Sequence, residues 1–501
     1  MLPLFVAIPL GVGFLLPLIE EFRERTKFFA VTVLLETGLL LALSIVKFGE
    51  KSIYRFGGWP PPVGINYVLD GLSSLVLVVI SSIAFVTALF AMTYMSKYQN
   101  LGKFYGLFSL MLAGMYGVAL TGDVFNMYVY LEVAAISSYA LVGFNRGPEE
   151  LEASFKYLIM GAVGSVFILL GIALLYGSVG SLNIADISVR VSEVSDQSFI
   201  LLSTALFIVG FGLKAAFIPF HSWLPDAHSS APTPISAMLS GVLIKVLGVY
   251  ALSRILFNGL NLPSLTPQIM TWIGAGSMFI GGMIALGQKD LKRLLAYSSI
   301  SQMGYITLGL GMGGIFISQG KPAVATLALI GGLFHLVNHA TYKSLLFLFS
   351  GGVERIFGTR DLSKIGGLTR VSPISGATGT IGTLSISGLP PFNGFWSKLV
   401  IVIAAIWGGL YPIAGIVLFT SAITLAYYLK VQRELFLGEV VGEITDRGKI
   451  SPGIYVPLLI LAICCIGLGL LYLPEIRGIV LEPAALALQE GSEYTQLVLG
   501  L

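Results

Sequence analysis

Long apolar runs separated by short polar connections extend along the chain from its first residues to about residue 473. The runs are continuous rather than alternating with polar positions, which predicts membrane-spanning helices and argues against the strands of a barrel. With spans of about 20 residues, fourteen are expected, at 2–19, 28–47, 70–94, 104–121, 123–144, 152–177, 198–220, 232–257, 266–287, 293–314, 323–350, 373–408, 411–436 and 452–473. The twelfth run is too long for one pass and is interrupted by GLPPFNG, so we expect it to be a broken helix.

Composition agrees with this pattern. Hydrophobic residues make up 55% of the chain and charged residues 11%, with a mean hydropathy of +0.88, whereas about a quarter of residues are charged in soluble domains. We therefore expect an all-α polytopic membrane protein. The run at 2–19 has no basic region before it and no small-residue cleavage site, so it should be a retained helix.

Redox and hydrolytic chemistry are not expected in this chain. Cys464 and Cys465 are adjacent within an apolar run, which excludes an iron–sulfur ligand set and an ordinary disulfide. The sequence has no Walker, HExxH or CxxC motif and no long basic face. We expect no cofactor, no metal site and no nucleic-acid partner.

Basic residues divide unevenly between the two sides that the spans define. Seventeen lie in connections on the side reached after the first span and seven on the other side. Basic connections stay on the cytoplasmic side, so we expect a multi-pass protein of the cell membrane with both termini outside. The seventeen are Arg23, Arg25, Lys27, Lys97, Lys103, Arg146, Lys289, Lys292, Arg293, Arg355, Arg360, Lys364, Arg370, Lys430, Arg433, Arg447 and Lys449. The seven are Lys47, Lys51, Arg55, Arg190, Arg254, Lys321 and Arg477.

Two similar interruptions, PFHSW at 219–223 and PFNGFW at 391–396, lie 172 residues apart. A shift of this size carries spans 4 to 8 roughly onto spans 9 to 13, so each copy of the repeat has five spans. Because five is odd, the second copy starts from the opposite side and the repeat is inverted, as in many ion and solute transporters. The expected units are three N-terminal helices (1–97), a first repeat (98–260), a second, inverted repeat (261–436), and a last helix with a C-terminal tail (437–501).

Five lysines lie inside apolar runs, where a charge costs at least about 2.5 kcal/mol unless protein or water surrounds it. Lys343 follows His339 and His335 at intervals of four, so the three share one helix face, about 6 Å apart along the axis. This stripe suits a proton relay. The other four lysines are Lys156, Lys214, Lys245 and Lys398.

Lys214 and Lys398 each lie close to an interruption, where irregular backbone exposes polar groups that hold water. Glu132, the only acid in the middle of the fifth span, is the expected partner of Lys214. The alternative is a static buried pair that fixes helix packing, although such pairs add little net stability. Lys245, in the eighth span, would connect the first-copy lysine to the histidine stripe.

The roles of four further residues stay open. Lys156 follows Glu152 by four residues and either joins the polar row or reaches the interface in a surface pair. Glu36 is an isolated acid in the second span, and we have no account of it. His221 and His228 flank the first interruption, where hydrogen bonding within a loop and proton uptake are equally open.

Five runs together resemble the antiporter-like subunits shared by respiratory complex I and Mrp-type multisubunit cation/proton antiporters. They are NMYVYLEVAAISSYALV (126–142), KAAFIPFHSWLPDAHSSAPTPISA (214–237), KRLLAYSSISQMGY (292–305), FHLVNHATYKSLLF (334–347) and GLPPFNGFWSK (388–398). The resemblance covers about residues 100 to 450. The run LPDAHSSAPTPISA and the length near 500 are most similar to the D-type member of the Mrp antiporters. Membrane-bound hydrogenases carry a similar subunit, so the parent complex stays open.

The resemblance implies two half-channels joined by a hydrated polar axis. Glu132 and Lys214 match the family's glutamate–lysine pair, and Lys245 matches its connecting lysine. The second-half relay corresponds to His335, His339 and Lys343, and the lysine of the second broken helix to Lys398. Some relatives have glutamate at this last position, which leaves the ion-pair scheme of the second half open. The implied partners are other membrane subunits of an Mrp-type or respiratory complex.

The leading hypothesis is a proton-translocating subunit of such a complex, with Na⁺/H⁺ exchange as an open variant. A stand-alone carrier of small cationic solutes is a second hypothesis. Only two acidic residues, Glu36 and Glu132, lie well inside spans, and two carboxylates are few for a cation site. A third hypothesis is a membrane scaffold whose polar axis is inert.

Overall fold

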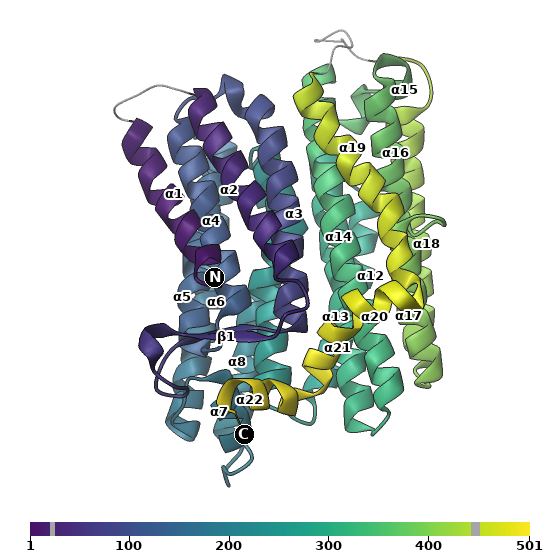
Figure 1. Ribbon diagram of the computed structural model, residues 1–501. Helices are drawn as coiled ribbons and strands as arrows, with labels where there is room; N and C mark the ends of the chain where they lie inside the picture. Colours follow the sequence, from purple (N-terminus) through teal and green to yellow (C-terminus); the bar gives the residue numbers. More distant parts are fainter. Residues whose placement is uncertain (21–25, 442–450, 501) are drawn as a thin grey trace.

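The computed structural model describes residues 1–20, 26–441 and 451–500. Its long helices stand side by side in two groups, N-terminal helices on the left of Figure 1 and the green helices of the second half on the right. The first group contains α1 (Leu4–Glu20), α2 (Thr26–Val46), α3 (Gly71–Tyr94), α4 (Leu101–Leu120), α5 (Val124–Val142), α6 (Pro148–Val179), α7 (Ile184–Arg190), α8 (Ser198–Ala215), α9 (Trp223–Ser230) and α10 (Thr233–Met238). Arg23, Arg25, Arg447 and Lys449, which entered the count of basic residues, lie outside the described residues.

The helix that begins as α10 continues with wide π-helical turns. These are η3 (Leu239–Leu243), η4 (Lys245–Tyr250) and η5 (Arg254–Gly259), with α11 (Ala251–Ser253) between the last two. The second group contains α12 (Thr266–Leu286), α13 (Leu291–Ser318), α14 (Pro322–Phe357), α15 (Leu368–Val371), α16 (Pro373–Ser387), α17 (Asn393–Trp407) and α18 (Tyr411–Val431), which ends in η7 (Gln432–Phe436). The C-terminal elements are α19 (Pro452–Gly467), η8 (Leu468–Tyr472), α20 (Pro474–Val480), α21 (Glu482–Gln489) and α22 (Gly491–Leu499).

Each of the fourteen expected spans coincides with a helix, and the twelfth consists of α16 and α17 with a break between them. Among the described residues, twelve helices are long and apolar enough to cross a membrane, while α1 and α17 are shorter apolar helices. The all-α polytopic expectation is therefore confirmed. One small departure within the described part is an antiparallel pair of strands, β1 (Ser52–Arg55) and β2 (Asn66–Leu69), in which Ser52 pairs with Leu69.

Small residues let the central helices approach closely. Where α12 and α13 cross, a Cβ added to Gly304 would lie 2.5 Å from the carbonyl oxygen of Gly274. Helix association in lipid relies on such close packing, because apolar side chains gain little by leaving lipid for protein. As a result α13 and α14 are buried along nearly their whole length, and polar side chains on them lie away from lipid.

The two helix breaks have the same backbone construction. The C-cap of α8 is Ala216, which has a left-handed φ of 56°, and the C-cap of α16 is Gly388, 172 residues later, with a φ of 80°. In both, an amide one residue further on bonds back across the turn, Phe217 to Gly212 at 2.9 Å and Leu389 to Leu384 at 3.3 Å. In Figure 1, α7 precedes α8 at the lower end and α15 precedes α16 at the upper end, so α8 and α16 run in opposite directions. The boundaries of the proposed copies stay a prediction.

The C-terminal segment crosses from the second group of helices to the first (Figure 1). α21 packs on both α3 and α14, and α22 packs on α7 and η5. Asn258 in η5 donates its side-chain amide to the carbonyl of Ala487 at 2.8 Å, and Lys51 pairs with Glu493. This segment, α20 to α22, is called the strap below.

Arg254 is an exception to its predicted place in an outer connection. It lies in η5, where 2% of its surface is exposed, and pairs with Asp70, which caps the first turn of α3. Its guanidinium also donates to Asn258 at 3.1 Å and lies 5.0 Å from the centre of the Tyr494 ring in the strap. Sequence analysis missed this pair because its two members are separated by 184 residues.

Candidate functional site

Lys214 and Glu132 meet beside the first helix break. Lys214 lies in the last turn of α8 and Glu132 near the middle of α5, with 3.4 Å between Nζ and Oε1. A charge-assisted hydrogen bond is usually about 2.7–2.9 Å long, so this contact is loose. Tyr139, two turns after Glu132 on α5, accepts from Lys214 at 3.1 Å. Ser165 of α6 donates to the Glu132 carboxylate.

The two partners differ in exposure. The side chain of Lys214 is 3% exposed and that of Glu132 is 24% exposed. Glu132 lies on a face of α5 that also presents Val129 and Ile136, which are 41% and 60% exposed. The Glu132 carboxylate is therefore partly exposed at an apolar surface of the molecule, whereas Lys214 is buried inside the protein.

Tyr139 and Ser165 were missed in the sequence, although a signal for the tyrosine exists. Positions seven apart share a helix face, and Tyr139 follows Glu132 by seven. Its hydroxyl lies against Gly161 of α6, where an added Cβ would come within 1.9 Å of the phenolic oxygen. The absence of a side chain at Gly161 therefore allows Tyr139 to reach Lys214.

Lys245 lies on the π-helical part of the eighth span. Its Nζ donates to the carbonyls of Ser240 at 2.5 Å and Gly241 at 2.7 Å, one turn earlier on the same helix. π-helical turns widen the helix and are frequent at functional sites. The helix approaches α8 closely at Gly248, since an added Cβ there would lie 2.5 Å from the Cβ of Ala215, the neighbour of Lys214.

His335, His339 and Lys343 lie on one face of α14, as predicted. His335 contacts Ser397 through Nδ1 at 3.0 Å and Gln302 through Nε2 at 3.1 Å. The His339 ring is parallel to that of His335, 6.4 Å away, and within the described residues neither of its nitrogens has a hydrogen-bond partner.

Lys343 is the last residue of this stripe, and its ammonium contacts polar groups of the neighbouring helix α13. Its Nζ donates to the carbonyl of Leu295 at 2.7 Å and to the hydroxyl of Ser298, both on α13. Tyr428 of α18 contacts the same Ser298 hydroxyl at 3.1 Å. The lysine is fully buried, so its ammonium is held by neutral groups alone among the described residues.

Lys398 lies at the second break and binds the end of the broken helix. From α17 its Nζ donates to the carbonyls of Ile386 at 2.8 Å and Ser387 at 3.4 Å, the last residues of α16. A positive charge at a helix C-terminus is favoured by the helix dipole. Lys398 also lies 5.1 Å from the centre of the Tyr305 ring. At each break a lysine ammonium therefore lies near the end of the first segment, that of Lys214 with a carboxylate partner and that of Lys398 with none among the described residues.

His228 and Lys292 belong to the same region, although the sequence did not place them there. His228 follows the first break, is fully buried, and its ring nitrogens have no partner within the described structure. Lys343, Lys245 and Lys292 are its electrostatic neighbours. Lys292, assigned to a basic connection, is 2% exposed and donates to the carbonyl of Ala231 at 2.9 Å. The prediction for Lys292 was wrong because α13 begins before it, at Leu291.

A polar cavity of about 130 Å³ opens beside Lys292 on the side of the basic connections. Three glutamates contribute to its lining, together with Ser229 and Ala231, which closely follow His228 in the chain. The lining residues are Tyr94, Tyr98, Asn145, Glu149, Glu150, Ser229, Ser230, Ala231, Pro232, Lys292, Glu354 and Arg360. The cavity therefore lies beside Lys292 and the segment that directly follows His228.

Lys156 and Glu36 fall outside the row. Lys156 is 47% exposed and pairs with Glu152 at 2.7 Å and Asp226 at 3.0 Å, which agrees with the surface interpretation. Glu36 is buried between α2 and α4 and accepts from Ser109 at 2.7 Å.

Fold and site together define a polytopic membrane protein with a buried row of lysines and histidines, and comparison with known proteins gives its family. The model of the NADH:quinone oxidoreductase/Mrp antiporter transmembrane family matches residues 121–424, and that of the complex I chain 5 N-terminus matches residues 61–105. The chain belongs to this antiporter-like family, whose members are subunits of multisubunit membrane complexes.

Similar proteins include subunits of NADH-quinone oxidoreductases and of Na⁺/H⁺ antiporters. The chain is 34% identical to NADH-quinone oxidoreductase subunit N of Desulforudis audaxviator, over 94% of each chain. It is 32% identical to the D subunit of the Na⁺/H⁺ antiporter of Alkalihalophilus pseudofirmus, over 87% of this chain and 86% of the relative. A chain of the Mrp complex from Dietzia sp. DQ12-45-1b superimposes with a TM-score of 0.90 at 28% identity, covering 100% of this chain and 99% of the other.

Proposed function

We propose that this chain translocates protons across the cell membrane, as the antiporter-like subunit of a larger complex. The observation that carries the proposal is the row of buried lysines Lys245, Lys343 and Lys398, which bind carbonyls and hydroxyls and have no carboxylate partner within the described residues. Burial at membrane depth favours the neutral form of a lysine. Such lysines accept and release protons at little cost, whereas paired ones stay charged.

The pair of Glu132 and Lys214 is proposed as the gate of the first half. When the pair is closed, the carboxylate holds the ammonium charge on Lys214. When the contact opens, Tyr139 keeps Lys214 in place while its charge is no longer balanced, which drives its proton towards Lys245. The loose 3.4 Å contact supports a pair that opens and closes rather than a static one.

The second half is proposed to carry the proton from Lys245 along the histidine stripe to Lys398. His335 and His339 are electrostatic neighbours of Lys245, and Lys398 is a neighbour of His335. A charge arriving at Lys245 therefore repels charge on the stripe and favours its onward movement. The acidic cavity beside Lys292 provides an uptake route through His228 on the side with the basic connections, which we assign to the cytoplasm.

A partner subunit is proposed to cover the exposed face of α5. A carboxylate that faces lipid acyl chains costs several kcal/mol, and Glu132 opens onto a face with exposed Val129 and Ile136. Membership of a multisubunit complex supplies the cover. Exchange of Na⁺ for H⁺ is the second candidate, favoured by the identity to the D subunit of a Na⁺/H⁺ antiporter.

The test is transport by the parent complex, isolated from native membranes and placed in liposomes with an internal pH dye. Lys343→Met keeps the bulk of the side chain and removes the titrating group. We expect proton translocation to fall at least about tenfold, which is about 1.4 kcal/mol in the barrier. Lys364→Met, at an exposed position on the same side, is the control and should leave the rate unchanged. Full-rate transport by an assembled Lys343→Met complex would exclude the relay, and a Na⁺ requirement in the wild type would favour exchange.

A further inference from the structure

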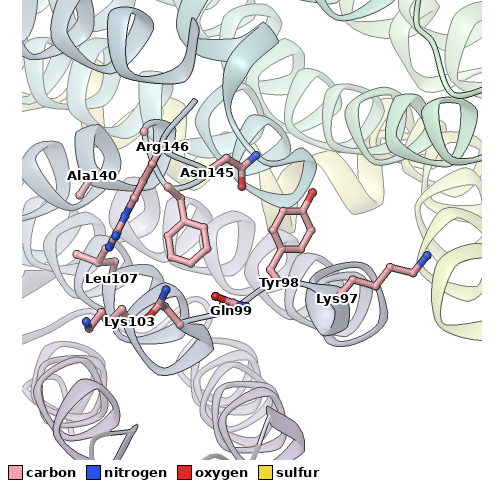
Figure 2. A pocket seen from close by; sticks show the side chains of 11 residues that line it. Lys97, Tyr98, Gln99, Lys103, Leu107, Ala140, Asn145 and Arg146 are labelled. Atoms are coloured by element: carbon pink, nitrogen blue, oxygen red, sulfur yellow. The ribbon is translucent and has the colours of Figure 1, made fainter. Parts of the chain in front are cut away.

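A basic cavity of about 640 Å³ lies outside the polar row, where three candidate spans end (Figure 2). It is formed by the connection between α3 and α4, the start of α4, the end of α5 and the connection after α5, at the level of the basic connections. Its lining residues are Lys97, Tyr98, Gln99, Asn100, Lys103, Leu107, Ala140, Gly143, Phe144, Asn145 and Arg146. The volume is within the range of small-molecule sites, about 300–1,000 Å³.

The charge of the lining is entirely positive. Lys97, Lys103 and Arg146 contribute to it, and no acidic side chain does. The nearest described carboxylate along α1, that of Glu20, accepts from the amides of Gly102 and Lys103 at 3.0 Å each. These amides are therefore occupied, and the cations have no carboxylate among the lining residues.

The lining combines a cationic part, with Lys97, Lys103 and Arg146, and an apolar part, with Leu107, Ala140 and Phe144. Figure 2 shows Arg146 reaching towards Leu107 and Lys103, while Lys97 extends from the opposite rim. Leu107 and Phe144 are half-buried and Ala140 is exposed on the α5 surface. A group that fits would carry negative charge next to apolar material.

The backbone supports Arg146 in an unusual conformation. Arg146 has a φ of 60° and its amide donates to the carbonyl of Gly143 at 3.0 Å, while Asn100 on the opposite loop has a φ of 57°. Left-handed geometry is common for asparagine but sterically unfavourable for arginine. Such strain concentrates at ligand-binding sites, and here it directs the guanidinium into the cavity.

We propose that this cavity binds the phosphate of an anionic phospholipid. The Arg146 guanidinium matches phosphate oxygens in a two-pronged contact, and the Lys103 ammonium adds a point charge. Leu107, Ala140 and Phe144 lie beside the glycerol and the first acyl carbons. Basic pockets between spanning helices on the cytoplasmic side bind such head groups. An inorganic phosphate shares the charge but not the apolar part of the cavity.

The test measures lipid bound to the full chain after purification in detergent and reconstitution into nanodiscs with equal phosphatidylglycerol and phosphatidylcholine. Lys103→Gln together with Arg146→Gln removes the two cations that face each other. A factor of about five per basic residue near an anionic surface predicts that the preference for phosphatidylglycerol falls about 25-fold. Lys364→Gln with Arg433→Gln, two exposed cations that do not line this cavity, is matched in charge and should keep the preference.

Two further measurements complete the test. One is a charge-preserving variant that controls for misfolding, and the other distinguishes a phospholipid from free inorganic phosphate as the ligand. Lys103→Arg with Arg146→Lys keeps both charges and should retain at least half of the bound phosphatidylglycerol. Inorganic phosphate in excess over the protein should not displace the lipid, because it lacks the acyl chains that the apolar lining residues would contact. Equal phosphatidylglycerol preference in the double glutamine and control variants would overturn the proposal. So would displacement by inorganic phosphate, or occupation of the cavity by an acidic segment of a partner subunit.

Discussion

The phenolic oxygen of Tyr139 lies 3.1 Å from Lys214 Nζ, nearer than the Glu132 carboxylate at 3.4 Å. Both groups come from α5, so the lysine is shared between a neutral acceptor and a charged one on the same helix. If Glu132 takes up a proton, Lys214 keeps a hydrogen-bond partner but loses its counter-charge. The position of the lysine and its charge are thus controlled by different residues.

Removal of either member of this pair should stop coupled transport. Lys214→Ala leaves a partly buried carboxylate without its cation, and Glu132→Ala leaves a buried ammonium without its anion, which costs about 3–5 kcal/mol when a buried pair is broken. We expect proton translocation in liposomes to fall at least about tenfold at matched expression. Lys156→Ala, at an exposed lysine of α6, is the control. Wild-type rates in both variants would exclude the gate.

Gly161→Ala should weaken the gate without touching a charged residue. The new methyl group would meet the Tyr139 hydroxyl, since a Cβ at this position would lie 1.9 Å from its oxygen. Displaced from Lys214, the tyrosine could no longer hold it, and the variant should transport like Tyr139→Phe, several-fold slower than wild type. Gly177→Ala on the same helix has nothing within 4 Å and should gain about 0.5–1 kcal/mol of helix stability with normal transport. Equal rates for the two glycine variants would show that Tyr139 has no part in the gate.

Lys343→Arg separates a fixed charge from a titrating one. Arginine keeps the positive charge and effectively never releases its proton, so the relay should stop although the complex assembles. Proton uptake into liposomes should fall to about the level of Lys343→Met, a loss of at least about tenfold. Lys364→Arg is the matched control at an exposed site. Full activity with arginine would mean that position 343 acts only as a fixed charge.

Asp70→Asn should detach the strap from the body of the protein. The substitution leaves Arg254 buried without its anion, and breaking a buried pair costs about 3–5 kcal/mol. Thermal unfolding in detergent should occur at a lower temperature, and the C-terminal residues should become sensitive to protease. Glu493→Gln disrupts an exposed pair in the same strap and should cost at most about 1 kcal/mol. Equal stability of the two variants would contradict an anchoring role for Asp70.

The same anchor has a predictable pH dependence. Burial alone would raise the pKa of Asp70, but the Arg254 guanidinium and the hydrogen bonds from Ser73 together hold the pKa of this carboxyl below its ordinary value. A carboxyl with a lowered pKa in the folded state stabilises the fold above its unfolded pKa of about 3.9, and this contribution is lost as the pH falls through the folded value. Protease sensitivity of the strap should therefore stay constant from pH 8 to about pH 5 and rise only below about pH 4. A rise near neutral pH would point to a different anchor.

The spans and the two breaks could be predicted from the sequence because each follows from one local rule. A spanning segment must be continuously apolar, and PFHSW and PFNGFW place prolines where a regular helix cannot continue. The buried lysines were found in the same way, from the cost of a charge at depth. The small strand pair of β1 and β2 and the short helices of the strap have no such length or composition requirement, and they were not predicted.

The residues that were missed are those whose position depends on distant contacts. Tyr139 is compatible with any apolar span, so nothing marks its hydroxyl as a partner of Lys214 until α5 and α8 are seen together. Lys292 and Arg254 lie near the ends of apolar runs, where the sequence cannot distinguish a solvated position from a buried one. His228 was noted beside the first break, but its burial depends on how α9 packs against α14, where Phe347 lies 5.3 Å from its ring.

The strap also affects how far the two groups of helices can move relative to each other. Because α21 contacts α3 and α14, and α22 contacts α7 and η5, a single segment is fastened to both groups of helices. Carriers that alternate access do so by rocking one half against the other, and a tie across the two halves resists that movement. For the proposed proton transport, the strap therefore favours local movements of the buried lysine and histidine side chains over relative motion of the two groups of helices.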